Sequence, residues 1–257
     1  WFTPIPAPYQ YQLISEGDSK KFPQMDLDAW PDLKLSQYKV QAEGIDKPIA
    51  ELIVAQQGDG PRVLTYWKNS TNEILYNLDR KPSELSALAA VIGKHAPKDA
   101  LILSWWDTSR QIKLLTGHDT LFTSHLNEPL MVPVAWLEQS KAIMAYENQF
   151  WESSANSKEQ EQFKRFSQAL AASAEEGVAQ LRELIGSNRE AYLIVHVTDL
   201  YKLGLMYPDK IGVAYQNFPL TGNMHGMINH MKVQLKENDF NTYTLQSLSD
   251  EEIRVFF

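Results

Sequence analysis

The sequence contains no cysteine among its 257 residues. Disulfide bonds, thiolate nucleophiles, iron–sulfur clusters and haem attached through a CxxCH motif are therefore excluded. The absence does not assign a compartment, because a cysteine-free chain suits both an oxidising periplasm and a reducing cytosol.

Long hydrophobic runs and an excess of basic residues are also missing. No window reaches the ~18 apolar residues of a membrane-spanning helix. The chain carries 24 Lys and Arg against 32 Asp and Glu, which disfavours a nucleic-acid binder, since such proteins present a basic face. The GxGxxG, GxxxxGK and GxSxG motifs are absent as well. We therefore expect no cofactor and assign no catalytic residue.

The first twelve residues read WFTPIPAPYQYQ, without an initiator methionine. We expect that a signal peptide, a membrane anchor or a tag preceded them. The rings of Trp1, Phe2, Tyr9 and Tyr11 suit the aromatic belt at the end of a membrane helix. A Pro-rich arm on the domain surface explains them equally well, and the sequence leaves both interpretations open.

The remaining composition, 44% hydrophobic and 22% charged, is that of a globular protein. We predict an extended arm over residues 1–35 and a single α/β domain over 36–257. Three β-rich runs at 37–69 indicate antiparallel strands. Strand and helix patterns then alternate, which predicts a three-layer α/β/α architecture with a largely parallel sheet and antiparallel edge strands. The expected helices are 82–96, 107–117, 134–151, 157–186, 198–208 and 224–238, and the later strands are 99–106, 119–125, 191–197, 210–216 and 242–257.

The stretch LSWWDTSRQI joins a predicted strand to a predicted helix. Asp107 suits an ordinary N-cap, whose carboxylate accepts the free backbone N–H groups of the first turn. Ligands of open α/β sheets, however, bind outside the carboxyl ends of the strands. Trp105 and Trp106 point to opposite sides of a strand, so one of them and Asp107 would form the wall of a pocket.

A second junction follows the strand at 191–197. On a helix Asp199, Lys202 and Met206 share one face, and Asp199 with Lys202 is also a simple local ion pair. Two Asp-bearing junctions on one parallel sheet would place both carboxylates at the same edge. The predicted ligand-binding residues are therefore Trp105, Trp106, Asp107, Asp199, Lys202 and Met206.

These two motifs, WWD and DxxKxxxM, resemble those of the soluble C-terminal domain of oligosaccharyltransferase catalytic subunits. The resemblance implies that the six residues bind the hydroxyl side chain of a peptide acceptor. Thr108 and Ser109 replace the Tyr-Gly of that family, and its catalytic membrane domain has no counterpart here. The resemblance therefore concerns a fold and a pocket over residues 99–206, and not glycosyl transfer.

The segments LSWWDTSRQIKLLTG and TDLYKLGLM through RVFF resemble the HaoB family, over most of the chain. This resemblance implies a membrane-anchored periplasmic protein that is encoded beside hydroxylamine oxidoreductase and has no established reaction. Its expected partner is hydroxylamine oxidoreductase or another periplasmic redox protein, with membrane contact only through a removed N-terminal anchor.

Histidines offer an alternative function. His118 and His125 flank a predicted strand near Asp107, and the stretch MHGMINHM with His225 suggests the soft ligands of copper. Helical spacing disfavours the copper site, because Met224, Met227, Ile228, Met231 and Leu235 form one apolar stripe, and we predict no metal. The first hypothesis is thus an accessory or binding protein. A metal-binding or catalytic protein and a peptide-binding domain are the alternatives.

Overall fold

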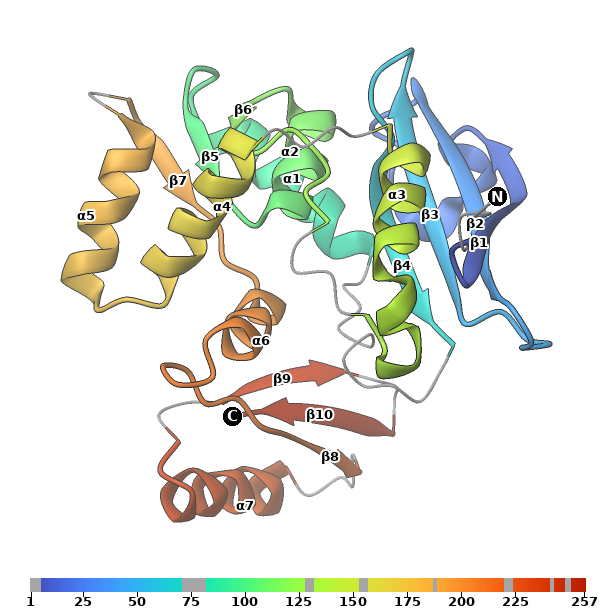
Figure 1. Ribbon diagram of the computed structural model, residues 1–257. Helices are drawn as coiled ribbons and strands as arrows, with labels where there is room; N and C mark the ends of the chain where they lie inside the picture. The colour runs from blue at the N-terminus through green and yellow to red at the C-terminus, as the bar shows by residue number, and fades with distance from the viewer. Residues whose placement is uncertain are drawn as a thin grey trace. The chain divides into compact units, whose positions relative to one another are not determined.

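A computed structural model describes residues 6–70, 82–127, 132–152, 157–186, 189–219, 224–240, 243–247 and 251–257. The chain divides into two compact units (Figure 1). Unit 1 comprises residues 1–166 and 178–194, and unit 2 comprises residues 167–177 and 195–257. Within the described residues no helix is long and apolar enough to span a membrane.

Unit 1 begins with a four-stranded antiparallel sheet in the order β1-β2-β3-β4. Its strands are β1 (Tyr9–Gly17), β2 (Leu33–Ala42), β3 (Ala50–Gln57) and β4 (Val63–Asn69). The antiparallel strands predicted at 37–69 are confirmed. Residues 9–17, part of the predicted arm, are extended, but they pair with β2 as an edge strand of this sheet.

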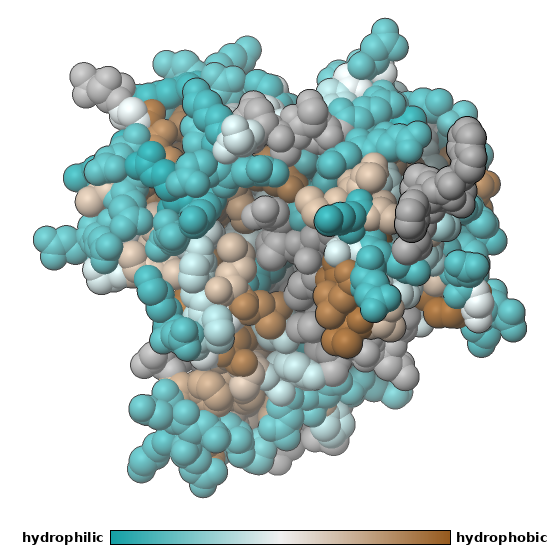
Figure 2. Space-filling model, viewed as in Figure 1, coloured by the Kyte–Doolittle hydropathy of each residue, from teal (hydrophilic) through white to brown (hydrophobic). Residues whose placement is uncertain are grey.

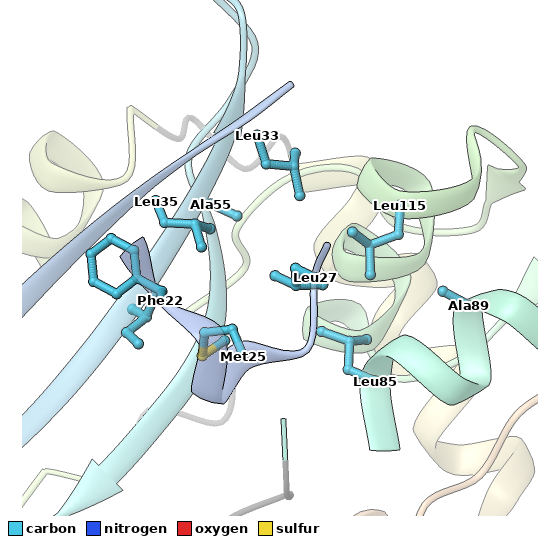
Figure 3. Close-up of a cluster of buried hydrophobic side chains, with 10 residues drawn as sticks. Phe22, Met25, Leu27, Leu33, Leu35, Ala55, Leu85, Ala89 and Leu115 are labelled. Atoms are coloured by element: carbon cyan, nitrogen blue, oxygen red, sulfur yellow. The ribbon is translucent and has the colours of Figure 1, made fainter. Parts of the chain in front are cut away.

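The alternation of side chains along the strands gives this sheet two apolar faces. One face carries the buried side chains of Leu33, Leu35, Ile53 and Ala55. They pack with residues of three helical segments, which are η2 (Pro23–Met25), α1 (Pro82–His95) and α2 (Trp106–Thr116) (Figure 3). The 3-10 helix η1 (Ser19–Lys21) precedes η2. On the other face, residues of opposite parity pack against α3 (Ser140–Phe150), which follows the 3-10 helix η4 (Val134–Gln139).

A parallel sheet in the order β6-β5-β7 forms the second half of unit 1. The strands are short: β5 (Leu101–Leu103), β6 (Asp119–Thr120) and β7 (Ala191–Leu193). Ile102 of β5, Ile92 of α1 and Ile112 of α2 form a buried cluster between the strand and the two helices. The predicted strand–helix alternation therefore holds here, with less strand than expected.

The helix predicted at 157–186 is two helices, α4 (Ser157–Leu170) and α5 (Ala174–Ile185). The break has a local cause. The Ser173 hydroxyl accepts the N–H of Glu176, as an N-cap does. A Cβ atom on Gly177 would lie 2.4 Å from the Ala169 carbonyl oxygen, so glycine permits the close approach of the two helices.

Unit 2 contains α6 (Val197–Met206), β8 (Tyr215–Pro219), α7 (Met224–Glu237), β9 (Thr244–Ser247) and β10 (Glu252–Phe256). Its strands form an antiparallel sheet in the order β8-β10-β9. Met231 of α7 packs with Phe218 and Val255 of the sheet, as the apolar stripe predicts. The mixed α/β class is confirmed, but the antiparallel strands form two separate sheets instead of edges on the parallel one.

Candidate functional site

The WWD motif lies at the junction between β5 and α2. The helix begins at Trp106, with Trp105 at the N-cap position, so Asp107 lies in the first turn and is not the cap itself. The Asp107 Oδ1 atom accepts the Thr108 N–H at 2.6 Å. A carboxylate in the first turn is also stabilised by the helix dipole. At the other end Gly117 adopts a φ of 72°, which favours glycine, and its N–H donates to the Lys113 carbonyl.

The two tryptophans of this motif lie in different environments. Trp105 is only 1% exposed and meets the Phe163 ring edge to face, with centroids 5.0 Å apart. Trp106 is half-buried and its ring centroid lies 4.6 Å from that of His125. Trp105 is therefore a core residue of unit 1, and Trp106 is the tryptophan with exposed surface beside Asp107.

Arg110 and His125 form a buried pair one turn further along α2. Arg110 Nη1 lies 3.0 Å from His125 Nδ1, and its Nη2 donates to the Arg62 carbonyl. Burial lowers the pKa of Arg110 to about 10, although the carboxylates of Asp107 and Glu159 oppose the shift. Burial, and next the Arg110 charge, lower the pKa of His125 to about 3. Because arginine only donates, the His125 imidazole is neutral and accepts through Nδ1.

Trp151 connects this pair to a buried carboxylate. The Trp151 indole stacks on the His125 ring with an interplanar angle of 15° and a centroid separation of 4.6 Å. Its Nε1 donates to Glu147 Oε2 at 2.7 Å. Glu147 is 4% exposed, although it carries a carboxylate. A carboxylate at such depth is stable only when its oxygens accept hydrogen bonds.

Two tyrosines of β1 supply the remaining hydrogen bonds. The Tyr11 hydroxyl donates to Glu147 Oε1 at 2.7 Å, and the Tyr9 hydroxyl donates to the same oxygen. Burial, and next the Glu147 carboxylate, raise the pKa of both phenols above the ordinary value. The neighbouring Tyr146 hydroxyl accepts the backbone N–H of Tyr11 at 2.7 Å and so fixes the position of β1 beside α3.

We call the connected set the ring–carboxylate cluster. Every member belongs to unit 1, and the members come from β1, from α2 and the loop after β6, and from the end of α3. The cluster comprises Tyr9, Tyr11, Trp106, Arg110, His125, Glu147 and Trp151.

The sequence predicts only part of this cluster. Trp106 and His125 are among the predicted candidates, whereas Tyr9 and Tyr11 are predicted as surface or membrane-interface residues, and no sequence pattern singles out Glu147. Trp1 and Phe2 lie outside the described residues. The available signal was the spacing: tyrosines two apart share one face of a strand, and Glu147 with Trp151 are four apart at the end of α3.

The second predicted junction follows β7, which pairs with β5 in parallel register. Asp199 is 2% exposed and accepts the His196 N–H at 2.8 Å, in a capping box at the start of α6. Lys202 Nζ lies 3.6 Å from Asp199 Oδ1, so the local ion pair is present. Met206 is the half-buried last residue of α6. Asp107 and Asp199 belong to different units, and their common edge stays a prediction.

The candidate metal-binding histidines are dispersed. His118 is buried, with its Nδ1 2.9 Å from the Thr116 hydroxyl, whereas His225 is exposed on α7. Among the described residues, no group of three or more His, Asp or Glu side chains could hold a metal ion. His118, His125 and His225 therefore do not form a common site in the described part of the chain.

Comparisons with curated proteins and with solved structures find no match. The resemblance of the WWD and DxxKxxxM motifs to oligosaccharyltransferase thus stays a prediction. A family model does match, over residues 1–257, and it is described as HaoA-associated protein HaoB. The chain therefore belongs to the HaoB family of HaoA-associated proteins, and this membership links it to hydroxylamine oxidation.

Proposed function

We propose that this protein is an accessory protein that binds hydroxylamine oxidoreductase. The observation that carries the proposal is the family match over the whole chain, whose description names association with HaoA. Binding, as opposed to catalysis, also suits the buried polar groups. Arg110, His125 and Glu147 hydrogen-bond mainly to one another or to neighbouring protein groups, so the proposed binding surface does not include them.

The proposed contact surface is the carboxyl edge of β5, at Trp106 and Asp107. Both side chains are half-buried, so each presents part of its surface to a partner. A tryptophan beside a carboxylate is a typical binding hot spot, because the ring provides apolar area and the charge provides orientation.

A second exposed surface of unit 1 provides a comparison. Hydrophobic side chains interrupt a mostly hydrophilic surface on the face shown in Figure 2. On η4 and α3 the exposed apolar residues are Val134 at 85%, Leu137 and Met144. Such residues also occur singly on ordinary protein surfaces, so the two surfaces need to be tested separately.

Co-purification with hydroxylamine oxidoreductase tests the proposal. Immobilised wild-type protein should retain the enzyme, and Trp106→Ala should reduce the retained amount strongly. Asp107→Asn should reduce it as well, whereas Asp59→Asn, the same charge change in the exposed β3–β4 turn, should leave it unchanged. Loss of binding only in Val134→Ser/Leu137→Ser would move the contact to η4. Failure of the wild-type protein to retain the enzyme would refute the proposal.

The proposed location is the periplasm, with an N-terminal anchor in the full-length protein. The support is the resemblance to the HaoB family described above. Cell fractionation tests this location: the native protein should be found in the membrane fraction and should be degraded by protease added to spheroplasts. Recovery in the cytosol would contradict it.

A peptide-binding role is the second candidate. It is favoured by one observation, that WWD and DxxKxxxM each come after one of two neighbouring parallel strands along the chain, β5 and β7. Peptides containing Ser or Thr should then bind the wild-type protein, and Asp107→Ala should abolish the binding. Equal binding of peptides with Ala in place of Ser or Thr would exclude this role.

A further inference from the structure

The ring–carboxylate cluster contains two indoles and two phenols, with the His125 imidazole between the two indoles. Trp106 meets His125 at a centroid separation of 4.6 Å, and His125 stacks on Trp151 at 4.6 Å. Trp151 and Tyr11 have centroids 6.2 Å apart. Tyr11 and Tyr9 follow at 5.8 Å. Indoles and phenols are the side chains that lose an electron most readily apart from thiols, and steps of this length are short for electron transfer.

We propose that the cluster is a relay that moves an oxidising equivalent from Trp106 to the Tyr9–Tyr11 pair. The half-buried Trp106 ring is its entry point, and the phenols at Glu147 are its end. This activity is separate from the binding of hydroxylamine oxidoreductase and does not depend on it.

The charges along the relay give it a direction. An electron vacancy is positive, so the Arg110 guanidinium beside His125 repels it and the Glu147 carboxylate beside the tyrosines attracts it. The neutral imidazole of His125 adds no further positive charge between the two indoles. Asp107 offsets the Arg110 charge near the entry, so the direction is set at the other end, where the Glu147 carboxylate accepts hydrogen bonds from the two phenols.

The final step is balanced within the cluster. A strong one-electron oxidant removes an electron from Trp106, and an electron from Trp151 refills it by passing across the intervening His125 ring, which is not itself oxidised. Tyr11 then gives an electron to Trp151 while its O–H bond breaks, and the proton moves to Glu147 Oε1, which lies 2.7 Å from the Tyr11 oxygen. The products are a neutral tyrosyl radical, a protonated Glu147 and the reduced oxidant. A one-electron reductant reverses the step.

A purely structural role at this position does not require buried ionic groups. Apolar side chains of similar volume commonly replace buried ionic groups without loss of stability. Here one buried carboxylate accepts two phenols and one indole N–H. The arrangement supplies a proton acceptor to each tyrosine at the end of the chain of rings.

Flash oxidation of the purified protein tests the relay. The oxidant is photogenerated tris(bipyridine)ruthenium(III), with a cobalt(III) amine as the sacrificial electron acceptor, and the readouts are transient absorption and electron paramagnetic resonance. The wild-type protein should yield a tyrosyl radical that forms as an indole radical decays. In Trp151→Phe the tyrosyl signal should be lost while an indole radical persists, and in Tyr9→Phe/Tyr11→Phe it should also be lost.

Two further variants separate the relay from a structural effect. Trp30→Phe removes an indole that hydrogen-bonds the Leu115 carbonyl, outside the chain of rings, and should leave the tyrosyl signal unchanged. Glu147→Gln should slow tyrosine oxidation and abolish its solvent deuterium isotope effect, with folding verified by circular dichroism. An undiminished tyrosyl signal in folded Trp151→Phe, or in the double tyrosine variant, would overturn the proposal.

Discussion

The imidazole of His125 lies parallel to the indole of Trp151 at a centroid separation of 4.6 Å, and its Nδ1 faces the guanidinium of Arg110 at 3.0 Å. The ring is thus enclosed between an indole and a permanent cation. Burial and the neighbouring Arg110 charge disfavour the imidazolium ion, and the pKa of His125 falls to about 3. His125 therefore contributes to the pH dependence of the stability of unit 1.

Acidification should destabilise the protein through His125. In the unfolded chain the imidazole binds a proton below its ordinary pKa of ~6.5, whereas in the folded chain it stays neutral down to about pH 3. The stabilisation of the folded state by the neutral His125 is therefore complete above pH 6.5 and is lost as the pH falls from there toward 3. Between pH 7 and pH 5 the free energy of unfolding should fall by roughly 2 kcal/mol.

Urea denaturation at pH 7 and pH 5 measures this effect. His125→Gln, which retains an acceptor for Arg110, should reduce the difference between the two pH values by roughly 2 kcal/mol. His225→Gln, at an exposed position of α7, serves as the matched control and should keep the wild-type difference. An unchanged pH dependence in His125→Gln would show that the folded imidazole is not held neutral.

Replacement of Glu147 should destabilise the attachment of α3 to β1. In Glu147→Gln one carboxylate oxygen becomes an NH2 group, which faces either the indole N–H of Trp151 or the two phenols, all of which are donors. The expected loss is about 2–4 kcal/mol in the free energy of unfolding. Tyr11→Phe, which removes a single donor, should cost only about 1 kcal/mol. Equal stability of wild type and Glu147→Gln would contradict the network.

Unit 2 offers an independent packing test. A Cβ atom on Gly204 would lie 2.3 Å from Val213 Cγ2, whereas a Cβ atom on Gly212 would meet nothing within 4 Å. Gly204→Ala should therefore lower the free energy of unfolding by about 1–3 kcal/mol, and Gly212→Ala should change it little. The double variant Gly204→Ala/Val213→Ala should recover part of the loss, since the two residues are in contact.

Local sequence patterns predict most of the helices and strands. The strands at β2–β4 and the helices α1, α2, α6 and α7 follow from alternation, helical stripes and caps, which are properties of adjacent residues. Patterns of this kind placed the α2 start one residue late, because the N-cap is Trp105, whose side chain makes no capping hydrogen bond. The predicted strand at 119–125 shortened to Asp119–Thr120.

The ring–carboxylate cluster was not predictable in the same way. Tyr9 and Glu147 are 138 positions apart, and their contact exists only because β1 pairs with β2 and α3 covers the sheet. The alternation in residues 9–17 covers only the first four, Tyr-Gln-Tyr-Gln, so the nine-residue strand also depends on its pairing with β2. Contacts of this sequence separation depend on tertiary structure, and a single sequence does not encode them as a pattern.

Sedimentation velocity of this protein and hydroxylamine oxidoreductase, each alone and then mixed, measures their association in solution. We expect a faster-sedimenting complex in the mixture, which dissociates with Trp106→Ala and persists with Asp59→Asn. Independent sedimentation of the two proteins at every concentration, with both of them folded, would contradict it.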